Sequence, residues 1–278
     1  MKSEEVKDIL NQLGSAPQKS KGQHFLLDET VCDRMVEVAN VSAGDTIVEI
    51  GPGLGVLTKK LAETGARVIS VELDKNFVQY IESLFQLDEN VTVLEGDILR
   101  LIKDTSIFGY IGEGSYKIVA NLPYNITSHL LKSFLTAAHK PEKMVVMIQK
   151  EVAERITEEP GKMSLLSLSV QYYADPRLVM NIPADAFYPP PQVNSAILDI
   201  DIKKDNPSRE EEKELFRLAR MGFVGKRKQL KNTMMNGLHW DAPKVEALLE
   251  KSNIKPQCRP QELSIDDWKR LAKECNLL

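Results

Sequence analysis

Short apolar segments alternate with longer amphipathic ones over the first half of the chain. The apolar segments are rich in β-branched residues, and their nearly continuous apolar character is typical of strands that are covered on both faces. Helical periodicity lies between them, as in residues 55–64 and 75–84. This repeated strand–helix order predicts a doubly wound, mostly parallel sheet. The predicted strands are residues 46–50, 67–72, 91–94, 117–120 and 144–148.

The pattern changes after residue 160. Ser164 has the character of an N-cap, and the following residues predict a helix that runs to Tyr173. Residues 177–182 and 194–202 then read as two strands joined by one loop, "PADAFYPPPQV". Because no crossover helix separates these strands, we expect an antiparallel hairpin at the end of the sheet.

A polar segment that contains proline, "KKDNPSREEE", separates the sheet from a helical C-terminal part. We therefore predict a domain boundary near residue 205. Residues 1–205 form the sheet domain, which begins with a short amphipathic helix, and residues 206–278 form a small all-helical domain. The C-terminal helices are predicted at residues 210–222, 226–237, 242–251 and 264–276.

Composition is that of an ordinary globular protein of 278 residues, 42% hydrophobic and 27% charged. The sequence has no run of about 18 apolar residues, so no membrane span is expected. The three cysteines, Cys32, Cys258 and Cys275, form no CxxC pair. They support neither a zinc site nor a disulfide framework, and a reducing cytoplasm fits best. We expect no metal, and a monomer.

The net charge of −4 argues against a nucleic-acid partner, but the charge is clustered. Residues 217–231, "RLARMGFVGKRKQLK", contain six basic residues and no acid. Such a stretch either binds phosphates or is the solvated face of a helix, and composition leaves both interpretations open.

Three polar features follow successive predicted strands. Gly51, Gly53 and Gly55 come directly after the first, in "EIGPGLG". Glu72 ends the second, and Asp97 follows the third. Parallel strand ends meet at one crevice, where an acid about 20 residues after the glycines can bind ribose hydroxyls. The alternative is a plain strand–helix turn, since G-x-G-x-G is not the dinucleotide spacing.

The fourth strand ends in Asn121, Leu122, Pro123 and Tyr124. The Asn121 side-chain oxygen and the Leu122 carbonyl could accept both N–H groups of an exocyclic aromatic amine. Pro123 restricts the residue before it, and Tyr124 could stack on the base. The amine would then attack the sulfonium methyl of S-adenosylmethionine. In the competing interpretation, Asn121 caps a turn and Tyr124 belongs to the core.

Nine segments follow one another along the chain: "KSKGQHFLLDE", "EIGPGLGVLT", "VELD", "EGDIL", "NLPYNITS", "QKEVAERI", "FYPPPQVNSAI", "GKRKQLKN" and "RPQELSIDDW". In this order and spacing they resemble the ribosomal RNA adenine N6-dimethyltransferases of the KsgA type. The resemblance runs from about residue 18 to the end of the chain. It implies a Rossmann-like fold, S-adenosylmethionine as cofactor and small-subunit (16S) ribosomal RNA as partner.

The resemblance also implies roles for individual residues. Phe187 and Tyr124 would sandwich the target adenine, although Phe187 could instead anchor a buried loop. The N-terminal residues 1–30 would contact cofactor and RNA. Cofactor contacts are expected at His24, Leu26, Gly51, Gly53, Glu72, Leu73, Asp97, Ile98 and Asn121, and RNA contacts at Lys19, Lys21, Arg220, Lys226, Arg227, Lys228 and Lys231.

The family implies dimethylation of two adjacent adenines in the terminal hairpin loop of small-subunit RNA. The nearest alternative is the related large-subunit RNA methyltransferase of macrolide resistance. The leucine after Asn121, the "NIT" extension and the C-terminal segments favour the small subunit. A ribosome-assembly binding factor and a nicotinamide-dependent dehydrogenase are alternatives of other classes.

Overall fold

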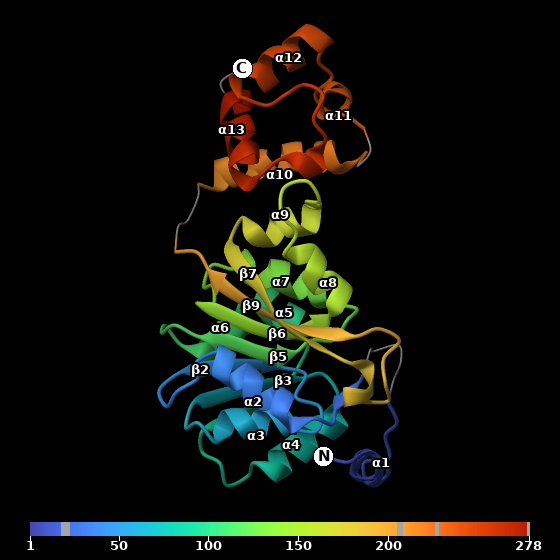
Figure 1. Cartoon of the computed structure of the whole chain (residues 1–278). Helices are drawn as coiled ribbons and strands as arrows, with labels where there is room; N and C mark the ends of the chain where they lie inside the picture. The colour runs from blue at the N-terminus through green and yellow to red at the C-terminus, as the bar shows by residue number, and fades with distance from the viewer. Residues whose placement is uncertain (18–22, 205–207, 226–227, 277–278) are drawn as a thin grey trace. The chain divides into compact units, whose positions relative to one another are not determined.

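A computed structural model describes residues 1–17, 23–204, 208–225 and 228–276. The chain forms two compact units (Figure 1). The first contains residues 1–153 and 174–202, and the second contains residues 154–173 and 203–278. The predicted boundary near residue 205 lies close to Lys203, where the chain enters the second unit for the last time. Residues 154–173, which come earlier in the chain, also belong to that unit.

The first unit is built on a seven-stranded sheet with the order β4-β3-β2-β5-β6-β9-β7. The strands from β4 to β6 pair in parallel, and β9 pairs antiparallel with both β6 and β7. The predicted parallel sheet and terminal hairpin are both confirmed. The strands are β2 (Thr46–Ile50), β3 (Arg67–Glu72), β4 (Val91–Glu95), β5 (Lys117–Asn121), β6 (Lys143–Gln149), β7 (Ala174–Ile182) and β9 (Ser195–Ile202).

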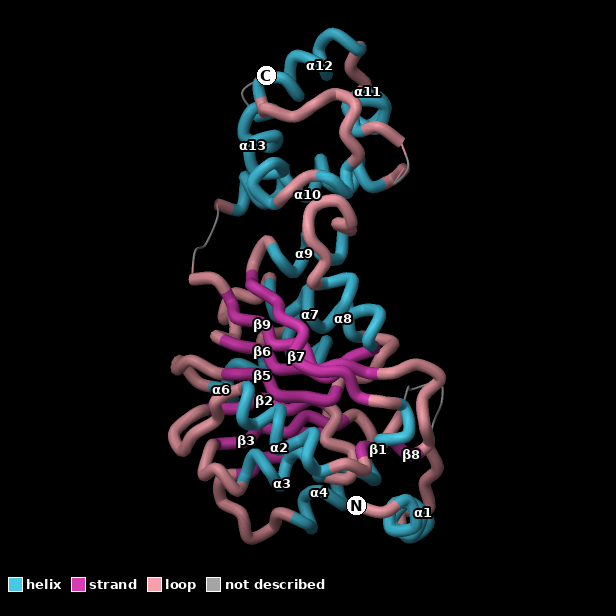
Figure 2. The backbone as a smooth tube through the Cα atoms, in the orientation of Figure 1, coloured by secondary structure: helices cyan, strands magenta, loops and turns pink. Residues whose placement is uncertain are grey.

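Helices cover both faces of the sheet (Figures 1 and 2). In Figure 1, α2 and α3 lie on the face turned to the viewer, and α5 and α7 lie behind. The side chains of Asp28, Asp74 and Asp97 cap α2, α4 and α5 by accepting a backbone N–H. The helices are α2 (Glu29–Val38), α3 (Val56–Ala62), α4 (Lys75–Leu84), α5 (Ile98–Lys103), α6 (Ser106–Ile111) and α7 (Thr127–Leu135). A further helix, α8 (Lys150–Ile156), begins in the first unit and ends in the second.

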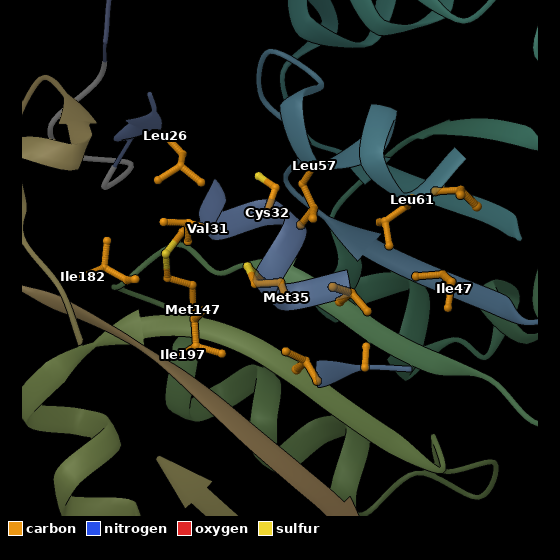
Figure 3. Packing of buried hydrophobic residues seen from close by; sticks show 14 of the residues in the cluster. Leu26, Val31, Cys32, Met35, Ile47, Leu57, Leu61, Met147, Ile182 and Ile197 are labelled. Carbon is orange, nitrogen blue, oxygen red and sulfur yellow. The ribbon is translucent and has the colours of Figure 1, made fainter. Parts of the chain in front are cut away.

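The core between α2 and the sheet is rich in sulfur and branched aliphatic side chains. Figure 3 shows Met35 of α2 facing Met147 and Ile197 of the sheet, with Cys32 one helical turn away. Met35, Met147 and Ile197 are fully buried. Burial of this kind is worth about 1.5–3 kcal/mol per large side chain, so this layer fixes how α2 sits over the sheet.

The N-terminal helix α1 (Ser3–Gln12) packs on the first unit through Val6 and Leu10, as its amphipathic pattern predicts. These side chains join a cluster with Phe25, Leu54 and Phe77. A two-stranded sheet of β1 (Phe25–Leu26) and β8 (Phe187–Tyr188), which the sequence did not predict, joins the N-terminal segment to the proline-rich loop.

The second unit is helical. Tyr172 and Tyr173 contact the ring of Phe216, and Gln261 exchanges hydrogen bonds with Gly161. Its elements are α9 (Leu165–Gln171), α10 (Arg209–Phe223), α11 (Leu230–Leu238), α12 (Ala242–Lys251), the 3-10 turn η3 (Pro260–Glu262) and α13 (Ile265–Asn276). Ser164 caps α9 as predicted.

The helix predicted over residues 226–237 begins later in the structure. Lys228 and Gln229 are not helical, Gln229 is the extended N-cap with φ −63° and ψ 144°, and α11 begins at Leu230, whereas residues 226 and 227 lie outside the described residues. Lys228 and Gln229 offer no apolar side chain to a core, so a helix there would bury nothing. Among the residues that the structure describes, each helix is too short or too polar to cross a bilayer.

Candidate active site

A cavity of about 270 Å³ opens at the carboxyl ends of β2, β3, β4 and β5, within the first unit. This is where an open α/β sheet is expected to bind its ligand. The predicted site residues that line it are His24, Leu26, Gly51, Gly53, Glu72, Leu73, Asp97, Ile98, Asn121, Leu122, Pro123 and Tyr124.

The glycine loop between β2 and α3 has left-handed backbone at each glycine, with φ of +65° at Gly51, +56° at Gly53 and +78° at Gly55. Only glycine adopts this conformation without strain. At Gly55 space is also short, because a Cβ atom would lie 2.9 Å from Cδ1 of Ile81. The loop therefore turns tightly enough for its backbone to form one wall of the cavity.

Glu72 is the acid at the end of β3, and it is 8% exposed. Its Oε1 accepts the backbone N–H of Leu73 at 2.8 Å and of Asp74 at 2.9 Å. Burial raises the pKa of Glu72, and these N–H donors, with that of Gly53, oppose the rise. The carboxylate is thus fixed at the cavity wall as a hydrogen-bond acceptor.

Asp97 lines the cavity just after the end of β4, the strand next to β3. One carboxylate oxygen caps α5 by accepting the N–H of Leu99 at 2.9 Å. Asp97 itself is exposed, and the neighbouring Leu73 is 60% exposed while Ile98 is buried. An acid flanked by apolar side chains suits a flat ring that carries an amine.

Glu49 also lines the cavity, although no sequence motif predicted a role for it. It is 1% exposed, and its Oε2 accepts the hydroxyls of Thr58 and Ser70, both at 2.7 Å. Burial raises the pKa of Glu49 to about 7. The sequence did contain a signal for this residue, because Glu49 is an acid inside an otherwise apolar strand, two residues before Gly51.

The loop after β5 carries the predicted acceptors. Asn121 pairs with Met147, and the N–H of Leu122 donates to the Met147 carbonyl at 3.0 Å. The Pro123 carbonyl accepts the Thr127 hydroxyl at 3.1 Å and so joins the loop to α7. The side-chain Nδ2 of Asn121 donates to the His24 carbonyl at 3.5 Å, which leaves Oδ1 as the acceptor of this amide.

Tyr124 is half-buried, and its ring stacks on that of His24 with centroids 5.6 Å apart. Its hydroxyl shares a hydrogen bond of 2.6 Å with Ser195, a residue for which the sequence predicted no role. Phe187 does not line the cavity. It is 2% exposed and packs in the core cluster with Leu26 and Ile182.

Charge distinguishes between cofactors. Within the described part of the chain, Glu49, Glu72 and Asp97 line the cavity, and no lysine or arginine does. Because burial raises the pKa of Glu49 to about 7, the negative charge of the lining comes mainly from Glu72 and Asp97. Such a lining, without a basic side chain, favours a cationic ligand over a pyrophosphate. No group of three His, Cys, Asp or Glu side chains in the same described residues could hold a metal ion.

The predicted RNA-binding residues differ in their surroundings. Arg220 and Lys228 are exposed, whereas Lys231 forms an ion pair with Glu246 of α12. In the same basic stretch, Arg217 is paired with Glu214. Four predicted residues, Lys19, Lys21, Lys226 and Arg227, lie outside the described residues.

Sequence comparison agrees with this geometry. The family described as "Ribosomal RNA adenine dimethylase" matches residues 14–277. The chain belongs to this family. As an rRNA adenine dimethylase, it is 41% identical to the ribosomal RNA small subunit methyltransferase A of Dehalococcoides mccartyi (strain 195), over 96% of this chain and 91% of that one. It is 34% identical to the enzyme of the same name from Moorella thermoacetica, over 95% and 94%.

Solved structures extend the likeness to the fold of the dimethylase. A dimethyladenosine transferase from Plasmodium falciparum superposes with a TM-score of 0.77 and 25% identity, over 91% of this chain and 98% of that one. The 23S rRNA methyltransferase ErmE gives a TM-score of 0.71 at 22% identity, over 91% and 99%. The predicted fold class, a Rossmann-like methyltransferase domain with a helical C-terminal region, is therefore confirmed.

Proposed function

We propose that this protein transfers methyl groups from S-adenosylmethionine to the N6 atoms of two adjacent adenines in the 3′-terminal hairpin loop of small-subunit ribosomal RNA. Family membership and the names of the relatives support the reaction and the RNA. The observation that carries the proposal for the site is the loop Asn121–Tyr124, which borders a cavity lined by carboxylates.

S-adenosylmethionine would supply an electrophilic methyl group on a cationic sulfur. The fit of the cavity rests on Glu72, whose buried carboxylate is held by two backbone N–H groups and can accept from ribose hydroxyls. Asp97 would accept from the adenine amine of the cofactor, between Leu73 and Ile98. The excess of acids in the lining also favours a cationic ligand.

The target adenine would place its amine between Asn121 Oδ1 and the Leu122 carbonyl. Accepting both N–H groups withdraws the nitrogen lone pair from the ring and makes it available for attack. Leu122 is held by its hydrogen bond to Met147, so its carbonyl is fixed before the substrate arrives. Because the nitrogen becomes cationic on methylation, its proton can leave afterwards without a strong base.

Tyr124 would stack on the target base, which is worth about 1–3 kcal/mol. Bases in a hairpin loop are already unpaired, so presenting one of them to the cavity costs little. Phe187 is proposed as the second aromatic from the family resemblance, and because it is buried, its contact with a base requires the proline-rich loop to move.

Arg220 and Lys228 are the described candidates for phosphate contacts.

We also propose that the protein acts as a monomer in the cytoplasm, where its RNA substrate is assembled. The three cysteines are unpaired, which supports a reducing compartment.

Mass spectrometry of small-subunit RNA treated with the protein and S-adenosylmethionine tests the function. We expect dimethyladenosine at two adjacent loop positions. Primer extension across both ribosomal RNAs provides the control, and methylation confined to the large subunit would contradict the proposed substrate. Calorimetric titration with S-adenosylmethionine and with NAD tests the cofactor, and binding of NAD alone would contradict the methyl transfer.

A further inference from the structure

Tyr124 is held by residues that lie far from it in sequence. Its hydroxyl is 2.6 Å from Oγ of Ser195, the first residue of β9. Ser195 is fully buried, and the sheet fixes its backbone on both sides, through pairing with Gln149 of β6 and Ile182 of β7. The partner of the tyrosine hydroxyl is therefore a rigid part of the sheet rather than a loop.

A second contact holds the ring itself. The His24 ring stacks on Tyr124 with an interplanar angle of 28°, and its Nδ1 is 2.7 Å from the Pro189 carbonyl. The pairing of Phe25 with Tyr188 places His24 next to Pro189. Both supports of Tyr124 thus depend on the segment 187–195, which enters the site from the antiparallel end of the sheet.

The bond between the two hydroxyls is one between neutral groups. Burial raises the pKa of Tyr124, and the bond to Ser195 opposes this rise. The phenol therefore keeps its proton at neutral pH. The terminal torsion of a tyrosine side chain is broad, so stacking on His24 sets the ring plane. The hydroxyl oxygen lies on the axis of that torsion, so its bond to Ser195 fixes the position of the far end of the ring.

We propose that Ser195 is a positioning residue for methyl transfer, which holds the Tyr124 ring in place so that a stacked adenine presents its amine to Asn121 and Leu122. This inference rests on the proposed function. Tyr124 lies three residues after Asn121, so the position of its ring determines where a stacked base lies relative to the acceptors. A shift of about 1 Å at a reacting centre can cost 10²-fold in rate, so even a small loosening of the ring matters.

The test is a double-mutant cycle of Ser195→Ala and Tyr124→Phe, measured on small-subunit RNA. Each change removes the same hydrogen bond from a different side. We expect each single variant to lower kcat by roughly two- to twelve-fold, the range for one lost hydrogen bond, with KM for S-adenosylmethionine changed less than twofold. The double variant should be no slower than the slower single variant. Ser128→Ala, an exposed change on α7, is the matched control and should keep the wild-type rate.

The outcomes separate the positioning role of Ser195 from the proposed function of the protein. Additive effects in the cycle, a normal kcat in Ser195→Ala, or an equal rise of KM for the cofactor would overturn the positioning role. Circular dichroism and thermal unfolding check that each variant folds, and if Ser195→Ala does not fold, a normal kcat in Tyr124→Phe alone would overturn it. If the wild-type protein methylates no adenine, the proposed function fails before the role of Ser195 is at issue.

Discussion

The side-chain Nδ2 of Asn121 donates to the backbone carbonyl of His24, 97 residues earlier in the chain. The amide at the end of β5 is thereby oriented by the N-terminal segment, which lies at the same cavity. One N–H of the amide points to His24, and Oδ1 is the acceptor atom of this side chain. Asn121 therefore offers an acceptor at the cavity, as the proposed role requires.

Replacement of Asn121 by alanine should abolish this acceptor. We expect Asn121→Ala to lower kcat on the order of 10²-fold or more, the usual cost of one preorganised hydrogen-bond partner, while binding to the small subunit is retained. Methyl transfer from labelled S-adenosylmethionine and sedimentation with subunits measure the two effects. Asn232→Ala, an exposed change on α11, is the control. A near wild-type rate in Asn121→Ala would refute the role given to this loop.

Glu49 should make stability depend on pH. Burial raises its pKa from 4.5 to about 7, so within this window the folded protein retains a proton that the unfolded chain releases. The free energy of unfolding should therefore fall as pH rises from 4.5 to 7, by about 3 kcal/mol, and then level off.

Glu49→Gln keeps an acceptor for Thr58 and Ser70 and cannot ionise, so it should flatten this pH dependence. Urea unfolding at pH 5 and pH 8 measures the effect. Glu82→Gln, an exposed change on α4, should leave the dependence as it is in the wild type. An equal slope in Glu49→Gln and wild type would show that another group is responsible.

Two glycines should respond in opposite ways to alanine. Gly55 has φ +78°, and a Cβ atom there meets Ile81, so Gly55→Ala should destabilise by about 1–3 kcal/mol through strain and overpacking. Gly109 lies inside α6 and a Cβ atom would meet nothing within 4 Å, so Gly109→Ala should stabilise by about 0.5–1 kcal/mol. Thermal unfolding compares them, and a stabilised Gly55→Ala would contradict the described turn.

The basic stretch 217–231 should show itself in the salt dependence of RNA binding. Arg220→Ala and Lys228→Ala should each weaken binding and reduce the slope of log K against log salt by about 0.7 on single-stranded RNA. Arg217→Ala is the matched control, because Arg217 is paired with Glu214 and should bind no phosphate. Unchanged slopes in the first two variants would instead support the interpretation of this stretch as the solvated face of a helix.

The sequence predicted the parallel half of the sheet well because its strands are buried on both faces and read as continuous apolar runs. Ile47, Val48 and Ile50 are all buried, for example. The glycine and acidic positions at the strand ends were also found, since parallel strands bring their carboxyl ends to one edge. Here local pattern and global fold demand the same residues.

The contacts that complete the site could not be predicted from local sequence pattern. β1 and β8 are two residues each, too short for any periodicity, yet their pairing brings His24 beside the proline-rich loop. Ser195 reads as an ordinary polar residue at a strand start, and its partner Tyr124 is 71 residues away. Such contacts depend on the strand order, which single-residue preferences do not specify.

The path of the chain also limits how this protein can be cut or recombined. Residues 154–173 enter the helical unit before the last two strands of the sheet are made, so no single cut separates the units. A protein truncated at Lys203 would keep Tyr172 and Tyr173 but lose Phe216, the ring that both tyrosines contact. The isolated C-terminal fragment would likewise lose Gly161, the partner of Gln261. Exchange of the helical unit between relatives would therefore require two grafts at once.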